Sequence, residues 1–408
     1  MQKNLLYFTA VMLISMMTCA ATMTSEKKVQ LRSSAHNVLA EALDTDDEYL
    51  RAEAVKAMHS ISCEELYPLF EKALDDDSWY VRFYATRAVN KIGDTLFIDL
   101  LHGLLDDDSL SVRINAAAAL HRLKDDIGVP ILKQAIKSGD VSDRRAVAIA
   151  MGLTENPGAI PMLIPLLNDD APAVRVEALN ALGDIGDTMS VSYIKEALHD
   201  TSFIVQVTAI AVLIEMADTS QIIASLGPLF EKAANLQLKA MIASGLLTKV
   251  GDTTGVSLLR EFIKSDDDEL KLMSAASLAM SGDVSAVPVF SKYLKSKDDY
   301  TRQQAIFFLS YIDENWATHL IEDALKDESI QVRKLALQIL GERGGAKSVG
   351  IIKKTLKDPQ PKVRIEAALA LHALGNDSGM NILEDLLMHD DWDVRIPAAA
   401  AIYEYMLK

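Results

Sequence analysis

Apolar residues recur along this chain as pairs of short stripes, each with the spacing of one helix face. In one representative stretch the first stripe has the i, i+3, i+4, i+7 pattern, at Ile160, Leu163, Ile164 and Leu167. The next stripe has similar spacing, at Val174, Ala178, Leu182 and Ile185. Gly186-Asp187 then matches a helix stop followed by a turn. The pattern predicts two short helices joined by tight turns.

This helical pair is one copy of a repeat of 31 residues. The repeats align on the basic residue of a "VR" dipeptide, here called the anchor, at Arg51, Arg82, Arg113, Arg144 and Arg175. Gln206 keeps the register, which resumes after three extra residues at Lys271, Arg302, Arg333, Arg364 and Arg395. The third residue after the anchor is usually alanine, as at Ala85, Ala116, Ala178, Ala336 and Ala367. Such small residues let helices of neighbouring repeats pack closely.

One helical hairpin cannot bury its apolar stripe alone, but a stack of hairpins buries a continuous core. The sequence therefore predicts an all-α fold, an α-α superhelix (α-solenoid) of about twelve hairpins. We expect a signal segment at residues 1–21, a short linker at 22–33 and the solenoid at 34–408. The extra residues make the repeat at 219–252 irregular, and a bend or hinge is one possible role for it.

The unit "AIPxLIxLLxDxxxxVRxxAxxALGxIGD" resembles the short HEAT repeat of the phycobilisome-lyase-like class over residues 34–408. The resemblance implies a solenoid whose second helices line a concave surface. It specifies no activity, because this repeat serves scaffolds, adaptors and some enzymes alike. The His-Glu pairs that bind iron in the related deoxyhypusine hydroxylases are absent from this sequence, so that activity is not implied.

Five repeats carry an aspartate six residues before the anchor arginine: Asp76/Arg82, Asp107/Arg113, Asp169/Arg175, Asp327/Arg333 and Asp358/Arg364. Such an aspartate can accept free backbone N–H groups at a helix start. The HEAT resemblance implies that these residues form a ladder of hydrogen bonds between neighbouring repeats. The alternative is calcium at the acidic triplets 75–77, 106–108 or 266–268. Three consecutive acids seldom converge on one ion, so the structural role is favoured.

The N-terminal sequence "MQKNLLYFTAVMLISMMTCAATMTSEKK" has a basic residue, an apolar run and then small residues, as secretory signals do. Cys19 lies where a bacterial lipoprotein carries its lipid, although the residues before it depart from the usual motif. Ordinary cleavage after Ala20 or Ala21 and an uncleaved anchor are the alternatives. We expect an exported protein of the periplasm or cell envelope, with membrane contact only through this segment.

The chain has 41 Lys and Arg against 58 Asp and Glu, a net charge of −17. Nucleic acid requires a basic stripe along its phosphates, so we exclude it as a partner. No cofactor, metal site or catalytic motif is predicted. Three histidines share one repeat position (His59, His121 and His372), but their repeats are not adjacent and they are not expected to converge.

Aromatic residues are the remaining candidates. Trp79 and Trp392 share the position three before the anchor, where packing at the start of the second helix is expected. Phe307 and Tyr311 are four apart on one helical face, and Met280 lies one repeat earlier. We expect these three to form an apolar patch in the concave groove, with inter-repeat packing as the alternative.

These observations predict a non-catalytic scaffold or adaptor of the bacterial cell envelope that binds a protein on its concave face. The alternative is an enzyme or enzyme subunit of the HEAT-like lyase type that acts on a small molecule or chromophore. A cleft with converging polar groups would favour the enzyme.

Overall fold

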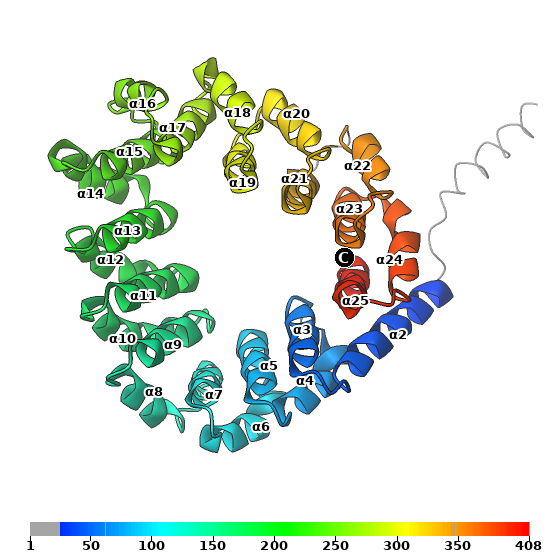
Figure 1. Ribbon diagram of the computed structural model, residues 1–408. Helices are drawn as coiled ribbons and strands as arrows, with labels where there is room; N and C mark the ends of the chain where they lie inside the picture. Colours follow the sequence, from blue (N-terminus) through cyan, green and yellow to red (C-terminus); the bar gives the residue numbers. More distant parts are fainter. Residues whose placement is uncertain (1–24, 62, 344, 346, 408) are drawn as a thin grey trace, which may run out of the picture.

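The computed structural model describes residues 25–61, 63–343, 345 and 347–407. In these residues all regular structure is helical, and the helices form two concentric layers (Figure 1). The outer layer consists of α2 (Ser25–Ala42), α4 (Tyr67–Leu74), α6 (Ile98–Gly103), α8 (Val129–Ile136), α10 (Ile160–Leu163), α12 (Val191–Ala197), α14 (Thr219–Lys232), α16 (Val256–Phe262), α18 (Val287–Tyr293), α20 (Asn315–Ala324), α22 (Val349–Thr355) and α24 (Met380–Leu386).

The inner layer consists of the second helix of each hairpin. These helices are α3 (Glu48–His59), α5 (Trp79–Ile92), α7 (Leu110–Arg122), α9 (Val141–Gly152), α11 (Pro172–Ile185), α13 (Phe203–Met216), α15 (Leu236–Gly245), α17 (Asp268–Met280), α19 (Asp299–Leu309), α21 (Ile330–Arg343), α23 (Pro361–Ala373) and α25 (Trp392–Leu407). The two layers confirm the predicted all-α solenoid. The alanine three after the anchor is fully buried in each repeat named above, which places successive inner helices in contact.

Local sequence accounts for the helix boundaries. Before α5, the Ser78 hydroxyl accepts a hydrogen bond from the backbone N–H of Tyr80. After α11, Gly186 adopts φ 68°, a left-handed conformation that costs glycine little, and its N–H donates to Leu182 O. Pro130 occupies the first turn of α8, where its missing N–H leaves no bond unmade.

The first helix starts earlier than the sequence pattern indicates. Residues 25–33 are expected to be part of a linker, but α2 begins at Ser25. Leu31 in this segment is buried in the hydrophobic core, and α2 packs along α25 at the other end of the chain. The linker assignment was therefore wrong for this segment, because its apolar partner lies in the last repeat.

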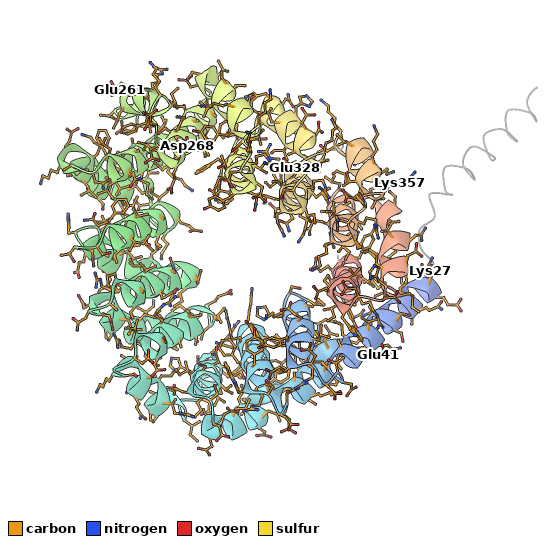
Figure 2. All side chains as sticks on the ribbon, in the orientation of Figure 1. Lys27, Glu41, Glu261, Asp268, Glu328 and Lys357 are labelled. Atoms are coloured by element: carbon orange, nitrogen blue, oxygen red, sulfur yellow. The ribbon has the colours of Figure 1, made fainter. Side chains whose placement is uncertain are left out.

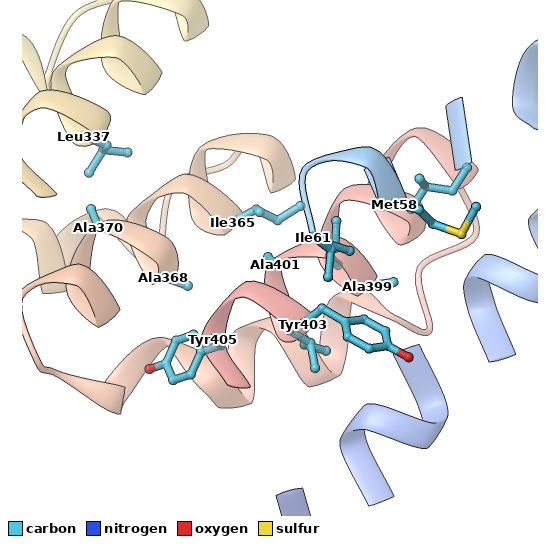
Figure 3. Close-up of a cluster of buried hydrophobic side chains, with 14 of the residues drawn as sticks. Met58, Ile61, Leu337, Ile365, Ala368, Ala370, Ala399, Ala401, Tyr403 and Tyr405 are labelled. Carbon is cyan, nitrogen blue, oxygen red and sulfur yellow. The ribbon is translucent and has the colours of Figure 1, made fainter. Parts of the chain in front are cut away.

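The contact between α2 and α25 closes the solenoid into a ring (Figure 1). Met58 and Ile61 of the first repeat lie in one buried cluster with Ala399 and Tyr403 of the last (Figure 3). Solenoid ends ordinarily need polar capping repeats, since each end exposes an apolar face. Here each end covers the apolar face of the other.

Polar contacts reinforce this seam. Lys27 on α2 pairs with Glu384 Oε2 at 3.0 Å. The hydroxyl of the fully buried Tyr403 lies 3.3 Å from His36 Nδ1 and donates to Glu65 Oε1, also at 3.3 Å. Figure 2 shows Lys27 on α2 beside the last repeat, and shows that the side chains of the inner helices leave the centre of the ring open.

The ring is sharply bent at α7. The Asn90 amide at the end of α5 donates to Ala150 O on α9, at 2.9 Å and two repeats away. Arg122 binds the carbonyls of Asn90 and Lys91, each at 2.8 Å, and so ties the end of α7 to the end of α5. Residues 114–120 of α7 are consequently buried, although they belong to the inner layer.

The irregular repeat differs from the others in both helices. Its outer helix α14 runs for 14 residues with Pro228 inside it. Its inner helix α15 continues into a π-helical turn at Leu246–Val250, and such a wide turn accommodates an inserted residue. Within the part of the chain described, no helix has the length and apolar character needed to cross a bilayer.

Candidate partner-binding surface on the inner wall

In several repeats the residues five and nine after the anchor are exposed on the inner helix, as Gln338 and Glu342 are in the tenth repeat. In the ninth repeat these positions are Phe307 and Tyr311, whose side chains are 46% and 53% exposed. Their rings meet edge to face, with centroids 5.3 Å apart. Phe307 lies on α19 and Tyr311 directly after it, so both follow one face of this helix. Inter-repeat packing, the alternative for these two rings, would have buried them.

The two rings border a pocket of about 460 Å³ between α19 and α21. Its lining is mainly apolar and carries amide and carboxylate groups, contributed by Phe307, Ser310, Tyr311, Leu335, Gln338, Ile339, Glu342 and Arg343. A pocket of this size accommodates a large apolar side chain. Gln338 and Glu342 are exposed at its edge and can bond the backbone of a bound segment.

Two polar groups of this pocket, the Ser310 hydroxyl and the Arg343 guanidinium, are already engaged. Ser310 Oγ donates to Phe307 O at 2.6 Å, so the hydroxyl has no base as its partner. Arg343 donates to Ile312 O at 2.7 Å and to Thr318 Oγ1 at 3.1 Å, and it also binds Leu309 O. Burial lowers the pKa of Arg343, but a guanidinium remains charged at neutral pH. Arg343 thus caps the end of α19, and the pocket offers binding groups rather than a nucleophile.

Met280 is not part of this pocket. It is exposed at the end of α17, one repeat before Phe307, and does not line the cavity. The structure brings together two of the three residues of the predicted patch.

The anchor arginines and the aspartates form a ladder around the ring. Six anchors bind a carboxylate of the next repeat, 25 residues on, through both Nε and Nη2: Arg51–Asp76, Arg82–Asp107, Arg144–Asp169, Arg175–Asp200, Arg302–Asp327 and Arg333–Asp358. The aspartate six residues before an anchor binds that anchor only through its backbone carbonyl. Arg82 Nη1, for example, donates to Asp76 O at 2.7 Å. Each arginine therefore joins two repeats.

Two of the anchor arginines, Arg113 and Arg364, lack such a carboxylate. Arg113 and Arg364 bind the carbonyls of Asp107 and Asp358, but the residues 25 positions on are Ser138 and His389. Where the rung exists, the hydrogen bond from Arg144 holds the pKa of Asp169 below its usual range.

In each acidic triplet the middle aspartate makes structural contacts. Both oxygens of Asp76 are bound by Arg51, and one also accepts Ser78 N–H at 2.8 Å. Asp267 caps α17 by accepting Leu270 N–H. Across the described ranges, no group of three or more His, Cys, Asp or Glu side chains is arranged to hold a metal ion.

The shared histidine position lies at helix ends. His121 Nδ1 is 2.7 Å from Asp126, and His372 Nδ1 is 3.4 Å from Asp377, in each case five residues on. The structure does not bring the three histidines together. Cys19 and the predicted signal segment lie outside the described residues.

A second group of aromatic side chains, not predicted as a site, lies on α3 and α5. It consists of Tyr49, Trp79, Tyr80, Phe83 and Tyr84, and we call it the aromatic platform. Trp79 is 52% exposed, so the expected packing role is wrong for it: among the described residues its one ring contact is with Tyr80, at 5.8 Å between centroids. One signal was present: tyrosine occupies the position two before the anchor at Tyr49, Tyr80 and Tyr300.

Comparison with known proteins agrees with this geometry. The family model for HEAT repeats matches residues 37–121, 128–214, 223–310 and 317–402, and the model for the PBS lyase HEAT-like repeat matches 112–138. A search of curated proteins gives no match.

Solved structures with a similar chain path are more distant. Human deoxyhypusine hydroxylase in complex with glycerol is 21% identical, covers 70% of this chain and 97% of its own, and has a TM-score of 0.29. The CpcE–CpcF complex of phycocyanin lyase from Nostoc sp. PCC7120 is 19% identical over 66% of this chain and 92% of its own, with a TM-score of 0.35. Kap95p in its complex with RanGDP is 15% identical, and the match covers 92% of this chain and 61% of its own, with a TM-score of 0.37. On the family match across most of its length, the chain belongs to the HEAT-repeat family.

Proposed function

We propose that this ring is a non-catalytic scaffold that binds a protein partner on its inner wall, at the pocket beside Phe307 and Tyr311. The observation that carries the proposal is the exposure of both rings at the edge of an apolar pocket. Exposed aromatic side chains around such a pocket are typical of the anchor points of protein interfaces.

The pocket chemistry defines the segment it takes. An apolar side chain enters between Phe307 and Ile339, while Gln338 and Glu342 bond the polypeptide backbone beside it. The engaged Ser310 hydroxyl and Arg343 guanidinium favour binding over the alternative of lyase-type catalysis.

The place of action follows from the N-terminal sequence. We propose that the protein is exported to the bacterial cell envelope, with Cys19 as the candidate lipid attachment residue. Mass spectrometry of the mature N-terminus tests this: a diacylglyceryl mass on Cys19 supports lipidation, and a chain starting after Ala20 or Ala21 contradicts it.

Site-specific photo-crosslinking tests the partner-binding proposal. A benzophenone amino acid replaces Gln338 at the pocket edge or, as the control, the exposed Leu96 on the outside of the ring. We expect one cross-linked polypeptide from position 338 only, and its loss in the Phe307→Ala/Tyr311→Ala variant with an unchanged melting temperature. Equal cross-linking from both positions, or a product that survives the double substitution, would contradict the proposal.

A further inference from the structure

We propose that the aromatic platform on α3 and α5 is a second binding surface, one that takes an acidic segment of polypeptide. It shares with the proposed function only the premise that the ring binds polypeptide, and it uses different residues. In Figure 1, α5 lies across the central opening from α19, the helix that carries Phe307.

The platform is a set of rings in mutual contact. Tyr80 lies at its centre, with ring centroids 5.7 Å from Tyr49, 5.8 Å from Trp79 and 5.0 Å from Tyr84. Phe83 continues the row, 5.2 Å from Tyr84. Edge-to-face contacts of this kind fix the orientation of each ring. Tyr49 is nevertheless 65% exposed, so the row presents a preformed surface that loses little side-chain entropy on binding.

Cations lie along this row. Lys56 Nζ is 4.2 Å from the ring centre of Tyr84, and the Arg87 guanidinium is 5.6 Å from that of Phe83. Lys56 and Arg87 each lie five residues after the anchor of their repeat. Phe307 occupies the same position in the ninth repeat. Lys91, four residues beyond Arg87, is exposed at the end of α5. The pKa of His59 is lowered mainly by burial and further by the positive charges of Lys91 and Arg87. Both cations therefore lie close to this imidazole.

Part of this positive charge is uncompensated. Lys56 pairs with Glu53 at 2.7 Å. Within the described residues, no carboxylate lies within ion-pair distance of Arg87, and its cation–π contact with Phe83 leaves its N–H donors available. Asp184 on α11 is the acid that Lys91 influences electrostatically, without an ion pair between them. A chain of net charge −17 thus carries two available cations beside an aromatic row whose members Tyr49 and Trp79 are exposed and whose other rings are partly buried.

Charge complementarity selects an acidic ligand for this surface. Carboxylates bonded to Arg87 and near Lys91 hold one end of the segment at the end of α5, and its backbone continues along the helix toward Tyr84 and Tyr80, which come before these cations. Tyrosine and tryptophan suit such a contact, since each offers apolar area together with a hydrogen-bonding group.

A polypeptide fits better than a nucleic acid. A nucleic acid strand carries a phosphate on every nucleotide and needs a continuous basic path. After Lys91, the position nine after the anchor is Arg122, which is engaged by the carbonyls of Asn90 and Lys91, and then Leu153. In the fifth and sixth repeats it is Asp184 and Glu215. Burial, and then Glu155 and Glu215, raise the pKa of Asp184, so these acids lie close enough to repel a phosphate chain. A short acidic segment ends before it reaches them.

The test is fluorescence anisotropy with the full-length protein and three labelled probes. These are a short peptide of alternating Glu and Tyr, the same peptide with Lys in place of Glu, and single-stranded oligothymidine. We expect saturable binding of the Glu peptide with Kd on the order of 10 μM, weaker at higher salt. The Lys peptide and the oligonucleotide should bind at least about tenfold more weakly, given the charge argument above.

Variants distinguish this surface from the rest of the ring. Arg87→Gln/Lys91→Gln and Tyr49→Ala/Trp79→Ala should each weaken binding of the Glu peptide about tenfold or more. Lys133→Gln/Lys137→Gln, a matched loss of two positive charges at the outer helix α8, should leave it unchanged. Phe307→Ala/Tyr311→Ala should also leave it unchanged, which separates this proposal from the proposed function. Absence of saturable binding, equal binding of either other probe, or insensitivity to both pairs of substitutions would overturn the proposal.

Discussion

Arg395 of the last repeat donates from Nη2 to Glu41 Oε2 of the first repeat, at 2.9 Å and across 354 residues of sequence. Elsewhere in the ladder an anchor arginine binds a carboxylate of the next repeat. For Arg395 the first repeat supplies the carboxylate. The ladder therefore continues across the seam.

Closure of the ring predicts a specific effect of Tyr403. This side chain is fully buried between α2 and α25, so Tyr403→Ala should cost about 3 to 5 kcal/mol at the seam. We expect a lower melting temperature and a larger radius of gyration by small-angle X-ray scattering. Tyr311→Ala removes an exposed ring of the same kind and should change neither quantity. A Tyr403→Ala protein with wild-type scattering would show that the seam does not depend on this residue.

The ladder predicts unequal costs for the same substitution at two anchors. Arg302 is almost fully buried and binds Asp327 through two bonds of 2.8 Å. Arg302→Met leaves that carboxylate unpaired and should cost about 3 to 5 kcal/mol. Arg364→Met breaks only carbonyl contacts and should cost about 1 to 2 kcal/mol. Urea unfolding of both variants measures the difference, and equal costs would contradict the assigned role of the rung.

Acid should destabilise the ring through its rungs. Hydrogen bonding to Arg144 lowers the pKa of Asp169 in the folded protein relative to the unfolded value of about 3.9. The folded state therefore gains stability from this ionised group above that value, and loses it as the pH falls through the folded pKa. Asp169→Asn should flatten the decline in melting temperature below about pH 4. Asp170→Asn, an exposed neighbour, is the control and should leave the slope unchanged.

Glu366 on α23 should have the opposite pH dependence. Burial raises its pKa in the folded protein, so its ionised form opposes folding at neutral pH. Stability from this group is greatest when it is protonated in both states, and declines as the pH rises from the unfolded pKa of about 4.3 to the folded value. Glu366→Gln should raise stability at pH 7 by less than about 1 kcal/mol, with the gain vanishing near pH 4. Glu71→Gln on the outer helix α4 controls for the loss of one charge. A gain that is the same at both pH values would contradict burial as the cause.

Much of the fold follows from sequence alone. The 31-residue spacing of the anchors and the two apolar stripes determine the hairpins, because a helix must bury one face and a repeated hairpin buries it on its copies. The same register identifies Phe307 and Tyr311 as residues of one helix face. The aspartates before the anchors also follow from this register.

Tertiary structure decided the rest. The partner of each anchor arginine lies 25 residues on rather than six residues back, because stacking brings the next repeat's aspartate to the guanidinium. Ring closure depends on the small rotation between each repeat and the next. The total rotation over the twelve repeats is set by packing, such as the Asn90–Ala150 contact at α7. No local pattern encodes that sum. For the same reason the aromatic platform on α3 and α5, and the position of α5 across the central opening from α19, became visible only when the ring was assembled.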